Sequence, residues 1–168
     1  MAPMATAHEK ASEHRGEYRL LGSEFPTDDG SCPPAVRAAL AAHAEAPDDH
    51  LRYLTAVTAL AGARVLVPVV AVLGEVEHDD QGRAFDKSSD MATVLMTGAD
   101  GRQALLAFTS METLQAWQAD ARPVPVSAAN AAKAALQDDA DALVVDIAGP
   151  VRLVVQGDLL RDLAAGTL

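Results

Sequence analysis

The sequence predicts an α+β fold: a single domain with a mixed, mostly antiparallel sheet of about five strands and flanking helices. Two strand-turn-strand patterns, over residues 92–108 and 142–155, predict hairpins. Apolar residues recur at helical spacing before, between and after these hairpins. The chain has 168 residues, of which 49% are hydrophobic, so it is large enough for one domain with a substantial core.

Two helices are expected at the start of the domain. Ser31 followed by two prolines is typical of a helix start, and Pro47 ends the apolar helical spacing that follows. We expect Asp48 to cap a second helix, which ends near Gly62. Residues 1–30 are polar and aperiodic, so they are expected to form a flexible N-terminal tail before a folded domain of residues 31–168.

Three strands are expected next. Residues 65–73 are nearly all apolar and rich in Val, which is typical of a strand buried on both faces. Pro68 cannot donate a ladder hydrogen bond, so it predicts a sheet edge or a bulge. Residues 92–96 and 103–108 follow as two strands joined by a Gly-Ala-Asp-Gly turn.

The remaining elements alternate between helices and a hairpin. Ser110 is expected to cap a helix that carries Trp117, and Ser127 to start an alanine-rich helix. The second hairpin, residues 142–155, comes before a last helix that Asp158 caps.

Charge and composition exclude several classes of partner. The formal net charge is −11, and phosphate backbones and anionic lipids repel such a chain, so neither nucleic acid nor membrane is an expected partner. The N-terminal residues contain no apolar run of the kind found in secretory signals. The single cysteine, Cys32, allows no intramolecular disulfide. We expect a cytoplasmic protein in a reducing compartment.

One polar loop is the first candidate binding site: Asp86, Lys87, Ser88, Ser89 and Asp90. It offers two carboxylates, an amine and two hydroxyls, which could grip a peptide terminus or a polar ligand. The alternative is that these side chains only shape the loop, because Ser and Asp bond readily to nearby backbone.

Trp117 is the second candidate contact residue. Large aromatic side chains anchor protein interfaces, but a Trp in an apolar helical stripe equally suits a core.

The sequence contains no recognisable catalytic set. Ser110 lacks the Gly-x-Ser-x-Gly motif of a nucleophile, and a helix cap explains it. His43 and His50, on either side of Pro47, are too few for a zinc site. We therefore assign no catalytic residue, metal ligand or cofactor. Enzyme activity stays open, and a non-catalytic role is the preferred interpretation.

Four segments carry a resemblance to a known family. They are Arg64-Val-Leu-Val-Pro68-Val-Val, Asp86-Lys-Ser-Ser-Asp90-Met-Ala, Gly101-Arg-Gln-Ala-Leu-Leu-Ala-Phe108-Thr-Ser110 with Trp117 after it, and Ala142-Leu-Val-Val-Asp146-Ile-Ala-Gly149-Pro150. Together they resemble the SseB N-terminal domain family, in its actinobacterial branch, over residues 48–163. The resemblance implies the fold and brings no catalytic residues with it.

We therefore expect a non-catalytic protein-binding module, an adaptor or regulatory domain, whose partner is another protein or a second copy of the chain. The alternative is a small-ligand binder or an enzyme that uses the loop of residues 86–90. A free sheet edge at residues 65–73 or an exposed Trp117 would favour the first function. A concave pocket at the polar loop would favour the second.

Overall fold

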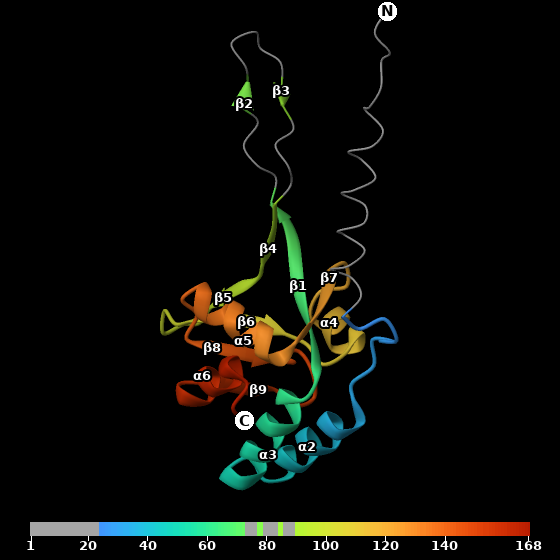
Figure 1. The fold of residues 1–168 in the computed structure, drawn as a ribbon, viewed down its shortest axis with the longest axis vertical. Helices are drawn as coiled ribbons and strands as arrows, with labels where there is room; N and C mark the ends of the chain where they lie inside the picture. Colours follow the sequence, from blue (N-terminus) through green and yellow to red (C-terminus); the bar gives the residue numbers. More distant parts are fainter. Residues whose placement is uncertain (1–23, 73–76, 79–83, 86–89) are drawn as a thin grey trace, which may run out of the picture.

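A computed structural model of the protein describes residues 24–72, 77–78, 84–85 and 90–168 (Figure 1). Over these residues the chain forms five helices and two main sheets, one of three strands and one of four, with a further two-stranded pairing of β2 (Glu77–His78) and β3 (Ala84–Phe85). The predicted α+β class is therefore confirmed. The strands are divided between two sheets, whereas the prediction placed them in one.

The first two helices form where the sequence predicts them. Helix α2 (Pro34–Glu45) begins at the expected prolines, and α3 (His50–Ala61) ends at Gly62. The prediction that Asp48 caps α3 is wrong by one residue. The carboxylate of Asp49 accepts hydrogen bonds from the first-turn backbone N–H groups at 2.9 and 3.3 Å.

Strand β1 (Arg64–Val72) is the centre of the three-stranded sheet. It pairs antiparallel with β4 (Asp90–Thr93) on one side and with β7 (Arg122–Ser127) on the other. The strand is therefore no free sheet edge, which removes one of the two features that would have favoured a protein-binding function. Strand β7 was not predicted, because its two prolines hide a strand pattern.

Pro68 lies in a gap of the hydrogen-bond ladder of β1. Leu66 exchanges both backbone hydrogen bonds with Phe108, at 2.7 and 2.8 Å. Backbone N–H groups two residues apart on a strand point to the same side, so the nitrogen of Pro68 also points away from β7. On this side of β1, Pro68 lies between the bridge of Leu66 to Phe108 and the first residue pair with β4, Val69 with Thr93. A central strand thus accommodates a proline without the edge or bulge that the sequence predicted.

The second sheet has the order β5-β6-β8-β9. Strands β5 (Leu95–Thr97) and β6 (Gln103–Ala107) form the first predicted hairpin, and β8 (Ala142–Val145) and β9 (Leu153–Gln156) the second. Strands β6 and β8 pair parallel, which makes the sheet mixed. The strand expected over residues 92–96 is in fact two strands, because the chain passes from one sheet to the other at Val94.

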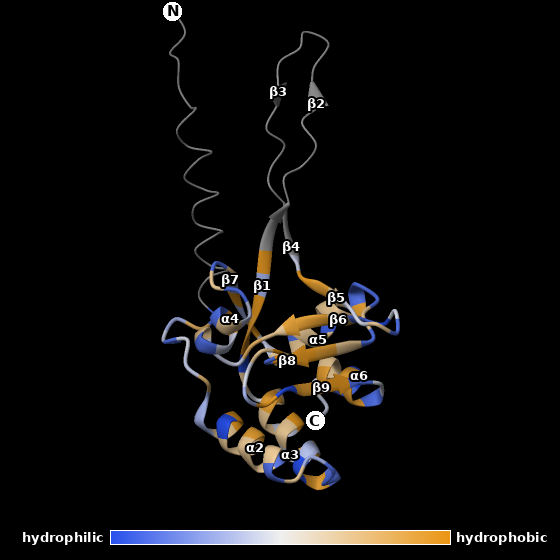
Figure 2. Cartoon of the chain, turned by 180° about the vertical axis from the view of Figure 1, so that it is seen from behind, coloured by the Kyte–Doolittle hydropathy of each residue, from blue (hydrophilic) through white to orange (hydrophobic). Residues whose placement is uncertain are grey.

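Side chains alternate across this sheet into two apolar clusters. Leu105 and Leu143 face the larger cluster, which also contains side chains of α2, α3, α5 (Ala128–Gln137) and α6 (Asp158–Ala165). Leu106 and Val144 face the smaller cluster under α4 (Met111–Trp117). Strands β6 and β8 are therefore apolar along most of their length, as the colouring of Figure 2 shows.

The caps of the later helices are confirmed for two helices out of three. Ser110 forms a capping box with Thr113 at the start of α4, and the Ser127 hydroxyl accepts from the Asn130 N–H at 3.2 Å. Helix α6 begins after Gly157, so Asp158 is its first residue and not its cap.

Candidate functional site

The predicted polar loop cannot serve as the basis of a described site. Asp86, Lys87, Ser88 and Ser89 lie outside the described residues, and Asp90 is the first residue of β4. Trp117 is half-buried and packs against the smaller cluster, with its ring centroid 5.5 Å from that of Phe108. Trp117 therefore contributes to the core, and its role as a contact residue stays a prediction.

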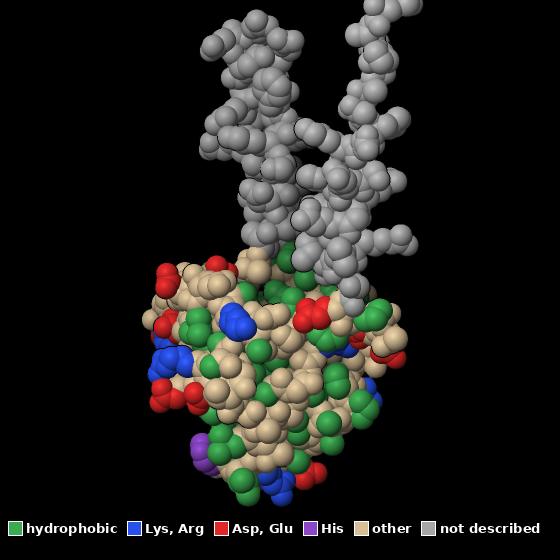
Figure 3. Space-filling model, viewed as in Figure 1, with side chains coloured by type: hydrophobic (Ala, Val, Ile, Leu, Met, Phe, Trp, Pro, Cys, Tyr) green, Lys and Arg blue, Asp and Glu red, His purple; other side chains and the backbone are tan. Residues whose placement is uncertain are grey.

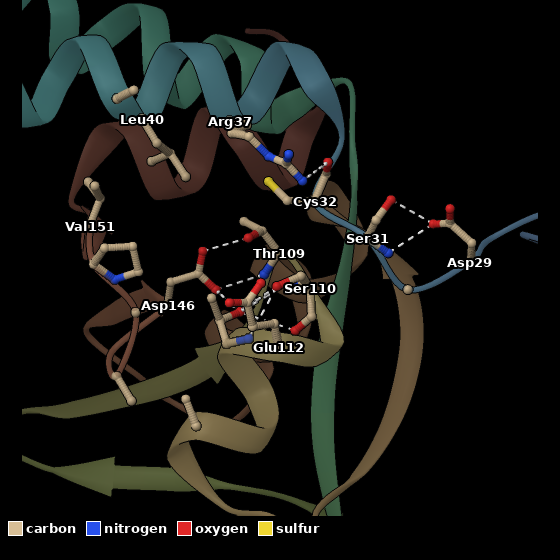
Figure 4. Close-up of a pocket in the computed structure, with 17 residues that line it drawn as sticks. Asp29, Ser31, Cys32, Arg37, Leu40, Thr109, Ser110, Glu112, Asp146 and Val151 are labelled. Atoms are coloured by element: carbon tan, nitrogen blue, oxygen red, sulfur yellow. Dashed lines mark hydrogen bonds between the residues drawn. The ribbon is translucent and has the colours of Figure 1, made fainter.

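A cavity of about 580 Å³ lies on the other side of α4, where four segments meet. Figure 4 shows it between the N-terminal half of α2, the segment that leads into α2, the start of α4 and the loop after β8. Its volume falls within the range of about 300–1,000 Å³ that is typical of ligand pockets. The lining residues combine apolar side chains with polar ones: Asp29, Gly30, Ser31, Cys32, Arg37, Leu40, Ala41, Thr109, Ser110, Glu112, Thr113, Ala116, Asp146, Ala148, Gly149, Pro150 and Val151.

Asp146 is the most deeply buried charged residue of the lining, with 3% of its surface exposed. Its Oδ1 atom accepts from the Thr109 N–H at 2.8 Å and from the Thr113 hydroxyl at 2.6 Å, and its Oδ2 atom accepts from the Thr109 hydroxyl at 2.6 Å. These three bonds, which we call the clasp, join the loop after β8 to the connection between β6 and α4 and to the first turn of α4. The clasp fixes two walls of the cavity relative to each other.

The turn after Asp146 depends on a glycine. Asp146 has a φ of 53°, a left-handed conformation that Asp tolerates better than most residues. The Gly149 N–H then bonds to the Asp146 carbonyl at 2.9 Å. A Cβ atom on Gly149 would lie 3.1 Å from both the Asp146 Cβ and the Thr113 Cγ2 atoms, so a side chain there would push these neighbours aside by a few tenths of an ångström.

Residues 28–32, which we call the strap, form another wall of the cavity. Arg64, at the start of β1, is 7% exposed and holds the strap from below. Its Nη2 atom donates to the Asp28 carboxylate at 2.5 Å and to the Ser31 carbonyl at 2.8 Å. Its Nη1 atom donates to the Thr109 carbonyl at 2.8 Å. Thr109 therefore connects the strap to the clasp through buried hydrogen bonds.

The strap is also fixed to the start of α4. The Met111 N–H donates to the Gly30 carbonyl at 2.8 Å, and Gly30 has a φ of 78°. A Cβ atom at this position would lie 2.7 Å from the Met111 Cγ atom, so only glycine fits. Residues 24–30 were predicted to belong to the tail, yet the last three of them contact the domain.

Three charged side chains lie nearer the mouth of the cavity: Asp29, Arg37 and Glu112 are all exposed. Hydrogen bonds from the Ser31 hydroxyl and the Ser31 N–H lower the pKa of Asp29, so its carboxylate stays ionised at neutral pH. Arg37 donates to the Cys32 carbonyl at 3.4 Å.

The lining offers no arrangement suited to nucleophilic catalysis. A nucleophile needs a general base within hydrogen-bond reach. The Ser110 hydroxyl is used as the cap of α4, and the Cys32 Sγ atom lies 3.7 Å from the Pro33 carbonyl oxygen. No His or Lys occurs among the described residues that line the cavity. Within the described ranges, no three His, Cys, Asp or Glu side chains converge as metal ligands would.

The sequence contains some signals of this site, although they did not reveal it. Thr109, Ser110, Asp146 and Gly149 all belong to the segments that carry the family resemblance. An Asp directly after an apolar strand and three residues before a Gly is a signal of a buried polar turn. The partners of Asp146 lie 33 and 37 residues away, a pairing that local patterns do not predict.

Fold and cavity together define an α+β domain with a ligand-sized cavity between a strap, two helices and the loop after β8. The model of the SseB protein N-terminal domain matches residues 36–162. The chain therefore belongs to the SseB N-terminal domain family, as its motifs indicated. No curated protein matches the sequence. In the part of the chain that the structure describes, no helix is both long and apolar enough to span a bilayer.

Proposed function

We propose that this domain is a non-catalytic binding module, which recognises a segment of another protein in the cavity between α2, α4 and the strap. The observation that carries the proposal is the cavity itself. Its walls are apolar at Leu40 and Val151, its mouth is charged, and its size suits a few side chains of a partner.

The state of the buried carboxylate supports binding over catalysis. Asp146 uses three of about four acceptor positions to hold the cavity walls together. This structural role accounts for a buried acid here without any reaction.

The sheet edge at β7 gives less support for strand addition. Pro123 and Pro125 lie opposite Pro68 and Leu66, whose nitrogens point away from β7. In antiparallel pairs of this kind the two nitrogens point away from each other. The nitrogens of Pro123 and Pro125 therefore point to the outer edge of β7, which lacks two N–H donors there. A partner strand would find few hydrogen bonds at this edge.

The surface also gives little support for a flat apolar interface. Among the described residues, the large exposed apolar side chains are those of Leu51, Leu95, Val124, Leu136 and Leu168, which come from separate parts of the fold. On the face that Figure 3 shows, hydrophobic side chains are scattered among polar atoms. The cavity is thus the more specific surface for a partner.

The experiment compares two tryptophan substitutions on helix α2. Ala41 is exposed and lines the cavity, so A41W fills the cavity without disturbing the core. Ala35 is exposed on the same helix and does not line the cavity, so A35W is the matched control. We expect a protein partner to co-purify from host lysate with the wild type and with A35W but not with A41W. An unchanged partner set for A41W would contradict the proposal.

The same assay tests the alternative site. A variant with Asp86, Lys87 and Asp90 changed to alanine removes the charges of the polar loop. Loss of the partner in this variant, with A41W unaffected, would transfer the binding function from the cavity to the loop.

A further inference from the structure

The buried carboxylate of the cavity has hydrogen bonds but no cation. Among the described residues, no Lys, Arg or His forms an ion pair with Asp146. Buried carboxylates are normally paired with a positive charge, because neutral donors compensate only part of the lost hydration. All three donors to Asp146 are neutral groups of Thr109 and Thr113. The described part of the chain therefore supplies no positive partner for the charge at the floor of the cavity.

Asp146 also retains capacity to accept a further hydrogen bond. A carboxylate offers about four lone-pair positions. The Oδ1 atom accepts two bonds from described residues and the Oδ2 atom accepts one, from Thr109 at 2.6 Å. The Oδ2 atom, on a side chain that lines the cavity, thus has room for one further donor.

The charges of the lining are unequal. Three carboxylates, those of Asp29, Glu112 and Asp146, line the cavity together with a single guanidinium, that of Arg37. The lining therefore carries a formal charge of −2, from three negative groups and one positive group. Arg37 is directed towards the Cys32 carbonyl in Figure 4, whereas Leu40 and Val151 form an apolar passage beside Asp146.

We propose that the cavity takes up a cationic side chain of its partner, an arginine or a lysine, whose aliphatic stem lies between Leu40 and Val151 and whose charged head reaches Asp146 Oδ2. This inference rests on the proposed function and specifies its ligand. Long basic side chains bury their methylene stems on apolar surface while the head group finds an anion, which is the combination that this cavity offers. Glu112 at the mouth adds attraction for the same charge.

The first test uses three matched peptides. The probes are acetyl-Leu-Arg-Leu-amide, the same peptide with citrulline in place of arginine, and the same peptide with glutamate. Citrulline has nearly the shape of arginine but no charge. Each is titrated into ¹⁵N-labelled full-length protein at low salt, with the amide signals of Gly30, Thr113 and Gly149 as reporters, because these residues line the cavity.

We expect the arginine peptide to shift these signals with a dissociation constant about fivefold lower than that of the citrulline peptide, because charge-assisted hydrogen bonds are about twice as strong as neutral ones. The glutamate peptide should be the weakest. Equal binding of the arginine and citrulline peptides, stronger binding of the glutamate peptide, or no shift at the reporter residues would overturn the inference.

Exposed residues provide variants that leave the clasp intact. E112Q should weaken binding of the arginine peptide about twofold, and R37Q should strengthen it about twofold, because it removes a like charge. Asp162 is exposed on α6 and does not line the cavity, so D162N controls for the change in net charge and should have no effect. Opposite signs for R37Q and E112Q are required; the same sign for both would contradict the assignment.

The failure of this inference can be told from the failure of the proposed function. If A41W releases the partner while the arginine peptide has no preference over citrulline, the cavity binds a partner by other chemistry. If A41W retains the partner, the proposed function itself is wrong.

Discussion

Replacement of Asp146 by alanine tests whether the clasp holds the cavity together. The substitution leaves the Thr109 N–H without an acceptor inside the protein, and Thr109 is only 2% exposed. An unsatisfied buried donor costs about 1–3 kcal/mol. The Thr113 hydroxyl can turn to the Ser110 carbonyl at 3.1 Å, so its loss is smaller. The left-handed φ of 53° adds about 1 kcal/mol for alanine.

Together these effects predict that D146A lowers the free energy of unfolding by about 2–4 kcal/mol, because the smaller loss at Thr113 is offset by removal of a desolvated charge. D146N keeps one oxygen for the Thr109 N–H, and Asn tolerates the left-handed conformation. We therefore expect a loss of about 1–2 kcal/mol for D146N.

Urea denaturation of the three proteins, followed by fluorescence and by circular dichroism, measures these differences. The expected order of stability is wild type, D146N, D146A. A D146A protein within about 0.5 kcal/mol of the wild type, which is the range of ordinary surface substitutions, would refute the account of the clasp.

Three further predictions concern the surroundings of the cavity. G149A should cost about 1–3 kcal/mol through overpacking, whereas G62A, whose Cβ would meet only a carbonyl at 4.0 Å, should change stability by less than about 1 kcal/mol in the same melt. R64M should destabilise the protein by about 3 kcal/mol. It should also speed hydrogen exchange of the Met111 amide, which bonds to the strap. Unchanged slow exchange of this amide would show that Arg64 does not hold the strap. Burial raises the pKa of Tyr53 above its ordinary value of 10.0. The stability that the buried neutral phenol contributes is therefore fully present below about pH 10 and declines as pH rises through the raised pKa. A pH series of urea melts should show that Y53F lacks this part of the decline.

Local signals predicted most of the helices and hairpins. Ser110 and Ser127 are caps because their side chains satisfy nearby backbone N–H groups, and that preference acts over three residues. The hairpins follow from short turns between apolar runs. These features depend on neighbours in the sequence, so the sequence alone carries them.

The elements that were missed depend on distant partners. Strand β7 is a strand because β1 pairs with it, although its two prolines disfavour that structure. Residues 90–97 form two strands that separate at Val94, because the first part pairs with β1 and the second part pairs with β6. A pattern of apolar residues does not state which sheet a strand joins.

The candidate site was missed for the same physical reason. The sequence drew attention to Asp86 and Asp90, where polar residues are adjacent in the chain. The walls of the cavity are instead held by bonds between Asp146 and Thr109, which are 37 residues apart, and between Arg64 and Asp28, which are 36 apart. Long-range hydrogen bonds of this kind arise only once the two sheets are in place.

The central claim is that a partner protein contacts the cavity between α2 and α4. A photo-reactive benzoylphenylalanine at position 41, irradiated in living host cells, tests this directly, with the same residue at position 35 as control. We predict a discrete crosslinked adduct with another protein from position 41 and none from position 35. Equal adducts from both positions, or an adduct from position 35 alone, would contradict the claim that the cavity is the binding site.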